Sequence, residues 1–359
     1  MSGFVYSLRK FHGRLYNNRI NLNNKLIWWK YITFPLGKKV YFIGTPNHTN
    51  IGDSAIAISE MFFLEKCGFD RNKIKEFTQF EFKKNYKGIC KLIRNNYLIC
   101  GIGGGNLGNQ WYDEELFRQS FLDAFPDNPT IIFPQTVYFT PDDTGRKALD
   151  NSYSHYNNHK NLTIVAREQK SFDLLNQYYS TPKKMLTPDI VLSSTMDDYG
   201  LESTERKGAL LLFRGDEEKF MSDNDRSEII SILKSLGIQY KITDMHSDCQ
   251  ITKNNRLEIV KDKMQQFVSS ELVITDRLHG MVFAAITGTP CIVFSNYNHK
   301  VQGTYDWIDY LSYIKYVDNI DEATKLIPKL LYMKNCKYDN KPLLPYFDEL
   351  AEVVKHYVN

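Results

Sequence analysis

The sequence predicts an α/β protein built from two Rossmann-like domains. Three observations support this prediction: short apolar runs alternate with stretches of helical periodicity, a polar stretch interrupts the alternation, and the chain is 359 residues long. That length exceeds the usual size of a single domain. Continuous apolar strands separated by helices are typical of parallel sheets with both faces covered.

In the first half of the chain, the apolar runs are expected to form buried strands, with amphipathic helices between them. The expected strands are residues 40–44, 97–101, 130–133 and 162–166, and the clearest helical stretches are residues 54–67 and 114–125. The carboxyl ends of such strands form the edge where α/β proteins usually bind ligands.

The second half repeats this alternation after residues 193–207, a polar stretch that is expected to be an interdomain linker. The expected strands are residues 208–213, 238–243, 271–274 and 290–294. We predict a basic aromatic segment (1–39), two Rossmann-like domains (40–195 and 196–335) and a C-terminal helical segment (336–359). This is a B-type glycosyltransferase arrangement, in which the site lies in the interdomain cleft.

Cysteine usage and hydropathy predict a cytoplasmic protein. The six cysteines show no C-x-x-C pair and no regular spacing, so they are expected to be reduced thiols. No window approaches the roughly 18 apolar residues of a membrane span. The N-terminus also lacks the apolar region of a secretory signal.

The N-terminal 39 residues are basic and aromatic. They contain eight Lys and Arg residues, and the first acid of the chain is Asp53. This segment either binds an anionic membrane surface peripherally or packs on the body as a helical hairpin with a solvated basic face. A nucleic-acid partner is not expected, because the basic bias stops abruptly and no nucleic-acid-binding motif follows.

Residues 44–54, GTPNHTNIGDS, join an expected strand to an expected helix. Their small and polar side chains let the backbone approach a ligand, and the helix start offers free N–H groups. Asn50 is a candidate substrate-binding residue. Asp53 is a candidate catalytic group, although an Asp at this position is also a common helix N-cap. His48 in the same loop favours a functional loop.

Residues 101–111, GIGGGNLGNQW, also follow an expected strand. Glycines here allow positive φ and close backbone approach to an anion. Gly104, Gly105 and Asn106 are therefore candidate substrate-binding residues. The spacing matches neither the dinucleotide-binding fingerprint nor a P-loop.

Polar residues follow two further expected strands, with Gln135 after one and Arg167 after the other. Arg captures carboxylate or phosphate with two parallel hydrogen bonds, so Arg167 is a candidate substrate-binding residue. Gln135 is a candidate substrate-binding residue because it also lies at the carboxyl end of a buried strand. The alternative for Arg167 is a surface pair with Glu168 that caps the next helix.

The strongest motif is residues 271–290, ELVITDRLHGMVFAAITGTP. Arg277 and His279 lie where a strand turns into a helix that begins at Gly280, so they form an anion site reinforced by the helix dipole. Gly280, at the start of that helix, is a candidate substrate-binding residue. No metal or cofactor is expected, because the histidines show no metal-binding spacing. Residues 223–225, which match D-x-D, precede a helix and are better explained by capping.

Together these motifs resemble the polysaccharide pyruvyl transferase family. The matches are N-I-G-D at 50–53, G-G-G-N-L-G at 103–108, the pair at 167–168, and T-D-R-L-H-G-x-x-x-A at 275–284. The resemblance spans about residues 40–310. The chain departs from the family at Asn109, where the family often has an acid.

The resemblance implies an enzyme of exopolysaccharide or capsule biosynthesis that joins phosphoenolpyruvate to two hydroxyls of a sugar. The products would be a pyruvate ketal and phosphate. In this interpretation Arg277 and Arg167 bind the carboxylate and phosphate of the donor. His279 is the candidate general acid or phosphate partner, and Asp53 is the candidate base. A lipid-linked saccharide acceptor would agree with the basic N-terminus.

Two alternatives remain open from the sequence. A B-type glycosyltransferase that uses a nucleotide sugar would also present glycine loops and cations to a diphosphate, and it would bind uridine or guanosine diphosphate. An inactive scaffold of the same fold would keep its function after Arg277→Ala and His279→Ala.

Overall fold

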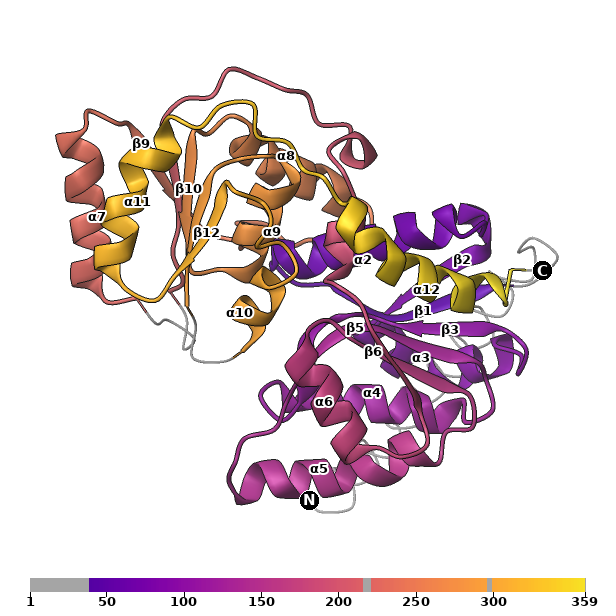
Figure 1. Cartoon of the computed structure of the whole chain (residues 1–359). Helices are drawn as coiled ribbons and strands as arrows, with labels where there is room; N and C mark the ends of the chain where they lie inside the picture. The colour runs from indigo at the N-terminus through magenta and orange to yellow at the C-terminus, as the bar shows by residue number, and fades with distance from the viewer. Residues whose placement is uncertain (1–38, 216–220, 296–298, 359) are drawn as a thin grey trace, which may run out of the picture.

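The computed structural model describes residues 39–215, 221–295 and 299–358, and the account below concerns these residues (Figure 1). They form two parallel sheets covered by helices, which confirms the predicted two-domain α/β fold. The basic segment, apart from Lys39, lies outside the described residues, so its membrane association stays a prediction.

The first sheet has strand order β2-β1-β3-β5-β6-β7, and β4 pairs with β5. Its strands are β1 (Val40–Thr45), β2 (Ile74–Thr78), β3 (Leu98–Gly101), β4 (Gly104–Gly108), β5 (Thr130–Tyr138), β6 (Leu162–Ala166) and β7 (Lys183–Leu186). The helices of this domain are α2 (Ile51–Lys66), α3 (Gln79–Leu92), α4 (Tyr112–Ala124), α5 (Asp143–Asn157) and α6 (Gln169–Tyr178), with a 3₁₀ turn η1 (Arg71–Lys73).

The second sheet has order β12-β11-β10-β8-β9. Its strands are β8 (Ala209–Leu212), β9 (Tyr240–Thr243), β10 (Leu272–Thr275), β11 (Cys291–Phe294) and β12 (Ile314–Val317). Its helices are α7 (Asp223–Ser235), α8 (Arg256–Val268), α9 (Leu278–Ile286), α10 (Lys300–Tyr305) and α11 (Ile320–Leu331). The D-x-D residues begin α7, where Ser222 and Asp225 form a capping box, as the sequence predicted.

Strand order reverses at the centre of each sheet. In the first sheet β1 pairs with both β2 and β3, and in the second β8 pairs with both β9 and β10. The loops after β1, β3, β8 and β10 therefore leave each sheet at its topological switch point, where such folds bind ligands. Three of the four predicted motifs that carry candidate residues lie in these loops.

The glycine-rich segment differs from the expectation of a loop, because Gly104–Gly108 is strand β4. Strand β5 is longer than its predicted core and continues past the end of β3, so its far half pairs with β4, with Leu107 opposite Val137. A register shift between Ile132 and Gln135 separates the two halves of β5. Pairing that depends on a distant partner strand is not readable from a local glycine pattern.

The two domains share one apolar cluster, which includes Val40 and Ile56 from the first and Leu210 and Val273 from the second. The connection between the sheets contains the 3₁₀ turns η2 (Ile190–Ser193) and η3 (Asp197–Tyr199), and the Tyr199 hydroxyl lies 2.8 Å from Ser59 Oγ on α2. The predicted linker region is thus packed against the first domain.

The C-terminal helix α12 (Leu344–Lys355), preceded by the 3₁₀ turn η4 (Lys341–Leu343), returns to the first domain and runs beside α2 (Figure 1). Phe347, Leu350 and Val354 join the apolar cluster shared by the domains. None of the helices in the described part of the chain has both the length and the hydropathy to cross a bilayer. All six cysteines are free thiols.

Candidate active site

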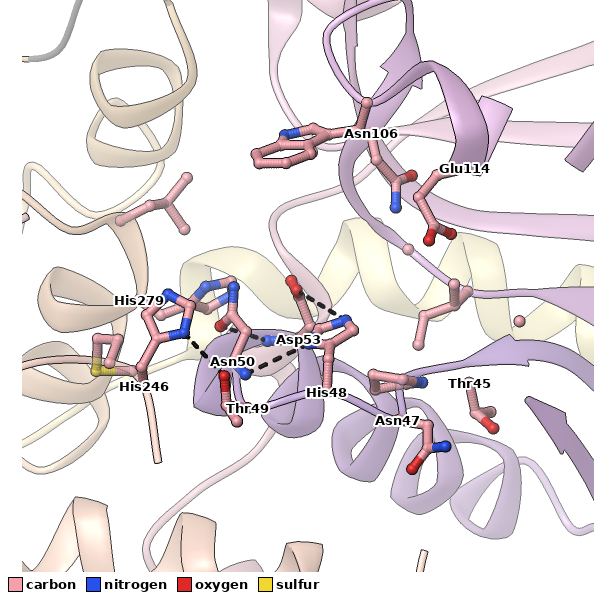
Figure 2. Close-up of a pocket in the computed structure, with 18 of the residues that line it drawn as sticks. Thr45, Asn47, His48, Thr49, Asn50, Asp53, Asn106, Glu114, His246 and His279 are labelled. Atoms are coloured by element: carbon pink, nitrogen blue, oxygen red, sulfur yellow. Dashed lines mark hydrogen bonds and ion pairs between the residues drawn. The ribbon is translucent and has the colours of Figure 1, made fainter. Parts of the chain in front are cut away.

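A cavity of about 540 Å³ lies between the two domains at the carboxyl ends of their sheets (Figure 2). The segment from Gly44 to Asn50 and the first turn of α2 form one side, and the start of α9 lies across from them. Seven of the predicted site residues line it: Asn50, Asp53, Gly105, Asn106, Arg167, Arg277 and His279.

Helix α2 begins at the cavity with Asn50 as its N-cap. The Asn50 side-chain oxygen accepts hydrogen bonds from Gly52 N at 2.9 Å and from Asp53 N at 3.3 Å. The reading of Asp53 as the N-cap is therefore wrong, because Asn50 already occupies that role. The Asp53 carboxylate instead faces the cavity, with Oδ2 3.6 Å from His48 Nε2 (Figure 2).

His279 lies in the first turn of α9 and packs against the first turn of α2. A Cβ on Gly52 would lie 2.3 Å from His279 Nδ1, so only glycine permits this approach. His279 Nε2 is 3.7 Å from Asp189 Oδ2, which makes the two groups charge neighbours. Burial lowers the pKa of His279, and the Asp189 carboxylate partly opposes that shift. The imidazole is thus largely neutral near neutral pH.

Arg167 is held in a buried network at the end of β6. Its Nε donates to Thr136 Oγ1 at 2.7 Å and its NH1 donates to Asp189 Oδ2 at 2.9 Å. A Cβ on Gly105 would lie 2.8 Å from Arg167 NH2, so this glycine makes room for the guanidinium. Arg167 and Glu168 are 3% and 0% exposed, so the surface-pair alternative is wrong.

Asp189 joins Arg167 to His279 and was not singled out from the sequence. It follows β7, a strand whose partly exposed residues gave no continuous apolar run. It is also the N-cap of η2, with Oδ1 accepting from Val191 N at 3.0 Å. A Thr-Pro-Asp sequence after a short strand is the only local sign of this position.

Arg277 is the N-cap residue of α9, and its NH2 donates to Asp244, with the two carboxylate oxygens at 2.8 and 2.9 Å. Two other cations of the second domain, Arg214 and Lys300, also line the cavity and were missed. Arg214 lies just beyond β8, so the rule that strand ends carry ligands was enough to find it. The cavity therefore presents cations from both domains.

The glycine segment is fixed by buried polar contacts. Gly103 N donates to Glu60 Oε1 at 2.7 Å, and burial raises the pKa of Glu60 well above its usual range. Asn106 Oδ1 accepts a short hydrogen bond from Arg118, whose NH1 also pairs with Glu115 at 2.6 Å. Asn106 therefore enters the cavity in a fixed orientation.

Three predicted substrate-binding residues do not line the cavity. Gln135 is fully buried, and its amide donates to Ile102 O at 2.6 Å, which supports the glycine segment from behind. Gly104 has φ of 135°, and an added Cβ there would lie 3.8 Å from the buried Ile56 side chain. Gly280 packs against Thr275, whose Oγ1 would lie 2.5 Å from an added Cβ.

Asn109, the departure from the family pattern, does not line the cavity. Its Nδ2 donates to Thr140 Oγ1 at 2.8 Å, and its Oδ1 accepts from Thr140 N at 2.8 Å. This reciprocal pair ties the end of β4 to the segment before α5. Asn109 therefore has a structural role in this chain.

Main-chain hydrogen bonds join the domains beside the cavity. Ile51 N donates to Met245 O and Ser247 N donates to Thr49 O, both at 2.8 Å. The Thr49 hydroxyl also lies 3.2 Å from His246 Nδ1 (Figure 2). These contacts hold the α2 start and the loop after β9 together, and they bring His246, which the sequence did not suggest, into the cavity lining.

The fold and the cationic interdomain cavity define a class, the two-domain α/β enzymes of B-type glycosyltransferase architecture. A Klebsiella pneumoniae protein of known structure shares this fold with TM-score 0.55 and 17% identity, covering 84% of this chain and 99% of that protein. UDP-GlcNAc 2-epimerase from Methanocaldococcus jannaschii shares it with TM-score 0.51 and 12% identity, covering 89% and 100%.

Residues 50–299 match the polysaccharide pyruvyl transferase family, and the chain belongs to that family. It is 34% identical over 322 residues to general stress protein 30 of Bacillus subtilis, covering 86% of this chain and 91% of that protein. It is 27% identical over 336 residues to pyruvyl transferase 1 of Schizosaccharomyces pombe, covering 89% and 82%. The chain is therefore a transferase, as its motifs predicted.

Proposed function

We propose that this enzyme transfers the enolpyruvyl group of phosphoenolpyruvate onto two hydroxyls of a sugar in a bacterial surface polysaccharide precursor. The observation that carries the proposal is the convergence of Arg167, Arg277 and His279 in one cavity, together with Arg214 and Lys300. A small donor that bears both a carboxylate and a phosphate needs several cations and N–H donors at close range.

The donor site supported by this geometry is rigid. Arg167 is fixed by Thr136 and Asp189, and Arg277 by Asp244, so both guanidinium groups are oriented before a ligand arrives. Fixed donors stabilise developing charge without reorganising during the reaction. No cofactor or metal is part of the proposal, and phosphoenolpyruvate is a substrate.

His279 is the proposed general acid. It delivers a proton to the methylene carbon of the donor, and the resulting oxocarbenium at C2 is attacked by the first sugar hydroxyl. Asp53, the proposed base, takes the proton of that hydroxyl. Both groups lie at the α2 start, and Asp53 raises the pKa of His279. A bound dianionic phosphate would raise it further, because negative charge favours the imidazolium.

Ketal formation is then completed by the second hydroxyl. Its oxygen bonds to C2 while the C2–O bond to phosphate breaks, and phosphate leaves with that electron pair and the hydroxyl proton. The proton that Asp53 takes up balances the proton that His279 delivered to the methylene carbon, which thereby became a methyl group. Atoms and charges therefore balance without an oxidant or a reductant.

The acceptor in this proposal is a lipid-linked saccharide at the cytoplasmic face of the membrane. Its support is the basic and aromatic composition of residues 1–39, which suits an anionic lipid surface. A nucleic-acid partner is no part of the proposal.

Calorimetric titration of phosphoenolpyruvate tests the donor. We expect saturable binding to the wild type and about 10- to 100-fold weaker binding to Arg277→Ala, since a hydrogen bond to a charged group contributes about 1.5–3 kcal/mol. Arg146→Ala is the matched control, because Arg146 is exposed on α5 and bonds to the nearby Asp143 and Pro141, away from the cavity lining.

Uridine and guanosine diphosphates are the competitors in the same titration. Binding of phosphoenolpyruvate that ignores both nucleotides supports the proposal. Tight nucleotide binding with no heat from phosphoenolpyruvate would instead support a nucleotide-sugar glycosyltransferase and overturn the proposed donor.

A further inference from the structure

Two large aromatic side chains are exposed on the lining of the cavity. Phe80 is 65% exposed and Trp111 is 54% exposed, although both line the same cavity as the buried cations. Lys84 Nζ lies 5.5 Å from the Phe80 ring centroid, whereas the Trp111 ring has no aromatic or cation contact with the described part of the chain. Aromatic rings are usually placed to bury their large faces, so an open indole beside a cavity favours a ligand that stacks on it.

Phe80 and Trp111 lie at the starts of helices α3 and α4, which contact each other. Gln79 Nε2 donates to Asp113 O at 3.4 Å, which links the first residue of α3 to the first turn of α4. Deeper in the same interface, Phe82 and Phe117 pack edge to face with centroids 5.5 Å apart. Helix packing thus places the backbone of Phe80 and of Trp111 at neighbouring helix starts on one side of the cavity.

Glu114 adds a polar group to the same wall. It lines the cavity, and no hydrogen bond or ion pair of its carboxylate is found among the described residues. Its neighbour Glu115 is buried and paired with Arg118, Gln119 and Tyr156. Figure 2 shows Glu114 beside Asn106 on the first domain, away from His279. One acid of this pair therefore stabilises the core, and the other faces the ligand space.

The wall that carries Glu114 and the open aromatic rings differs in charge from the rest of the cavity lining. Cations line the cavity from both domains, Arg167 from the first and Arg214, Arg277 and Lys300 from the second, whereas Glu114 adds a negative charge beside the two rings. A carboxylate disfavours an anionic donor beside it and accepts hydrogen bonds from hydroxyl groups. An uncharged ligand with several hydroxyls and an apolar face fits this wall.

We propose that Trp111, Phe80 and Glu114 form the subsite for the saccharide acceptor, an inference that rests on the proposed function. A pyranose ring stacks its C–H face on Trp111, with Phe80 at the rim. Glu114 accepts a hydrogen bond from a sugar hydroxyl. This arrangement would hold the acceptor between the aromatic wall and the donor bound at Arg167, Arg277 and His279.

Saturation-transfer NMR on the full chain tests this subsite, using as probes the methyl β-glycosides of galactose, glucose and N-acetylglucosamine. We expect transfer to at least one glycoside in the wild type. Its affinity should fall about tenfold or more in Trp111→Ala, as expected when an aromatic stack is lost. Tyr112→Ala is the matched control, because Tyr112 is exposed next to Trp111 but does not line the cavity.

A second pair of variants separates the carboxylate from the ring. Glu114→Gln should weaken the glycoside, whereas Asp113→Asn, one residue away and outside the cavity lining, should not. Both changes keep the size of the side chain at residues that are not buried, so the test survives if Trp111→Ala fails to fold. Equal effects in both members of either pair would overturn the proposed subsite.

Calorimetry of phosphoenolpyruvate on the same samples distinguishes the two proposals. Donor binding to the wild type without transfer to any glycoside, with or without the donor present, overturns the subsite and leaves the proposed function standing. Glycoside binding that depends on Trp111, without any binding of phosphoenolpyruvate, overturns the proposed donor and leaves the subsite standing. Trp111-dependent binding of uridine monophosphate in place of glycosides also overturns the subsite, because the occupant would be a nucleobase.

Discussion

The cavity has an inner wall, which carries the buried cations, and an outer wall, which carries Trp111, Phe80 and Glu114. The two walls differ in how their side chains are held. On the inner wall, Arg167 and Asp189 are 3% and 1% exposed and bonded to each other, and Arg277 is bonded to Asp244. On the outer wall, Trp111 is 54% exposed and Glu114 has no ion pair within the described residues. The same cavity thus combines a preorganised charged surface with an open aromatic one.

This difference has a physical reason. A charge removed from water must be paired and hydrogen-bonded, and once fixed it can stabilise charge that develops in a reaction. Exposed aromatic rings and a partly exposed carboxylate carry no such requirement and can bind a ligand that arrives and leaves. The contrast assigns the charged chemistry to the inner wall and acceptor recognition to the outer one.

The largest expected effect comes from the inner wall, with His279→Gln. If His279 is the general acid, kcat should fall about 10²- to 10⁴-fold, measured as phosphate release with donor and acceptor. His159→Gln is the matched control, because His159 is also buried with a lowered pKa but does not line the cavity. A fall of less than about tenfold would remove His279 from this role.

The pH dependence sharpens the same comparison. Because burial lowers the pKa of His279, kcat/KM should decrease as pH rises through a value below about 6.5, the ordinary pKa of His. The kcat profile should break at higher pH, since the bound anion favours the imidazolium. If kcat and kcat/KM broke at the same pH, the assignment of His279 as the general acid would be contradicted.

Stability should change with pH in the opposite direction to kcat/KM, and should increase as pH rises. With the pKa values of His279 and His159 lowered in the folded state, the unfolded chain binds more protons just below about pH 6.5. This contribution to the free energy of unfolding is present above that pH and is lost as pH falls through the lowered pKa values. In chemical denaturation, the free energy of unfolding should fall less between pH 7 and acidic pH in His279→Gln or His159→Gln than in the wild type.

An intermediate effect is expected from Gly52→Ala, which moves His279 without changing it. The added Cβ would lie 2.3 Å from His279 Nδ1, so the ring must shift away from the α2 start. We expect kcat to fall roughly 10- to 100-fold, since misplacing a group by about 1 Å has effects of this size. Gly237→Ala controls for stability alone, because nothing lies within 4 Å of its added Cβ although φ is 69°. Unchanged kcat in Gly52→Ala would show that the ring position is not critical.

The smallest effect is expected next to the outer wall, with Asn109→Asp. This change restores the acid that the family often has at this position. It removes the hydrogen bond from Asn109 Nδ2 to Thr140 Oγ1, so the free energy of unfolding should fall by about 1 kcal/mol. We expect kcat to stay within about twofold, because Asn109 does not line the cavity and the loss is that of one structural hydrogen bond. Higher activity in this variant would mean that an acid here reaches the substrate.

The sequence by itself determined the α/β class, most strand positions and the family. Each of these depends on local features: apolar runs, their alternation with helical periodicity, and motifs at strand ends such as the one that carries Arg277 and His279. Parallel strands place their carboxyl ends on one edge, so residues after separate strands could be assigned to one site before any contact was known.

Only the tertiary structure decided which neighbours face the cavity. Asn50 rather than Asp53 caps α2, Glu114 rather than Glu115 reaches the ligand space, and Asp189 links Arg167 to His279. These outcomes depend on pairing partners that are distant in the sequence, because a side chain turns toward whichever hydrogen-bond donor or apolar surface the packed fold brings near it.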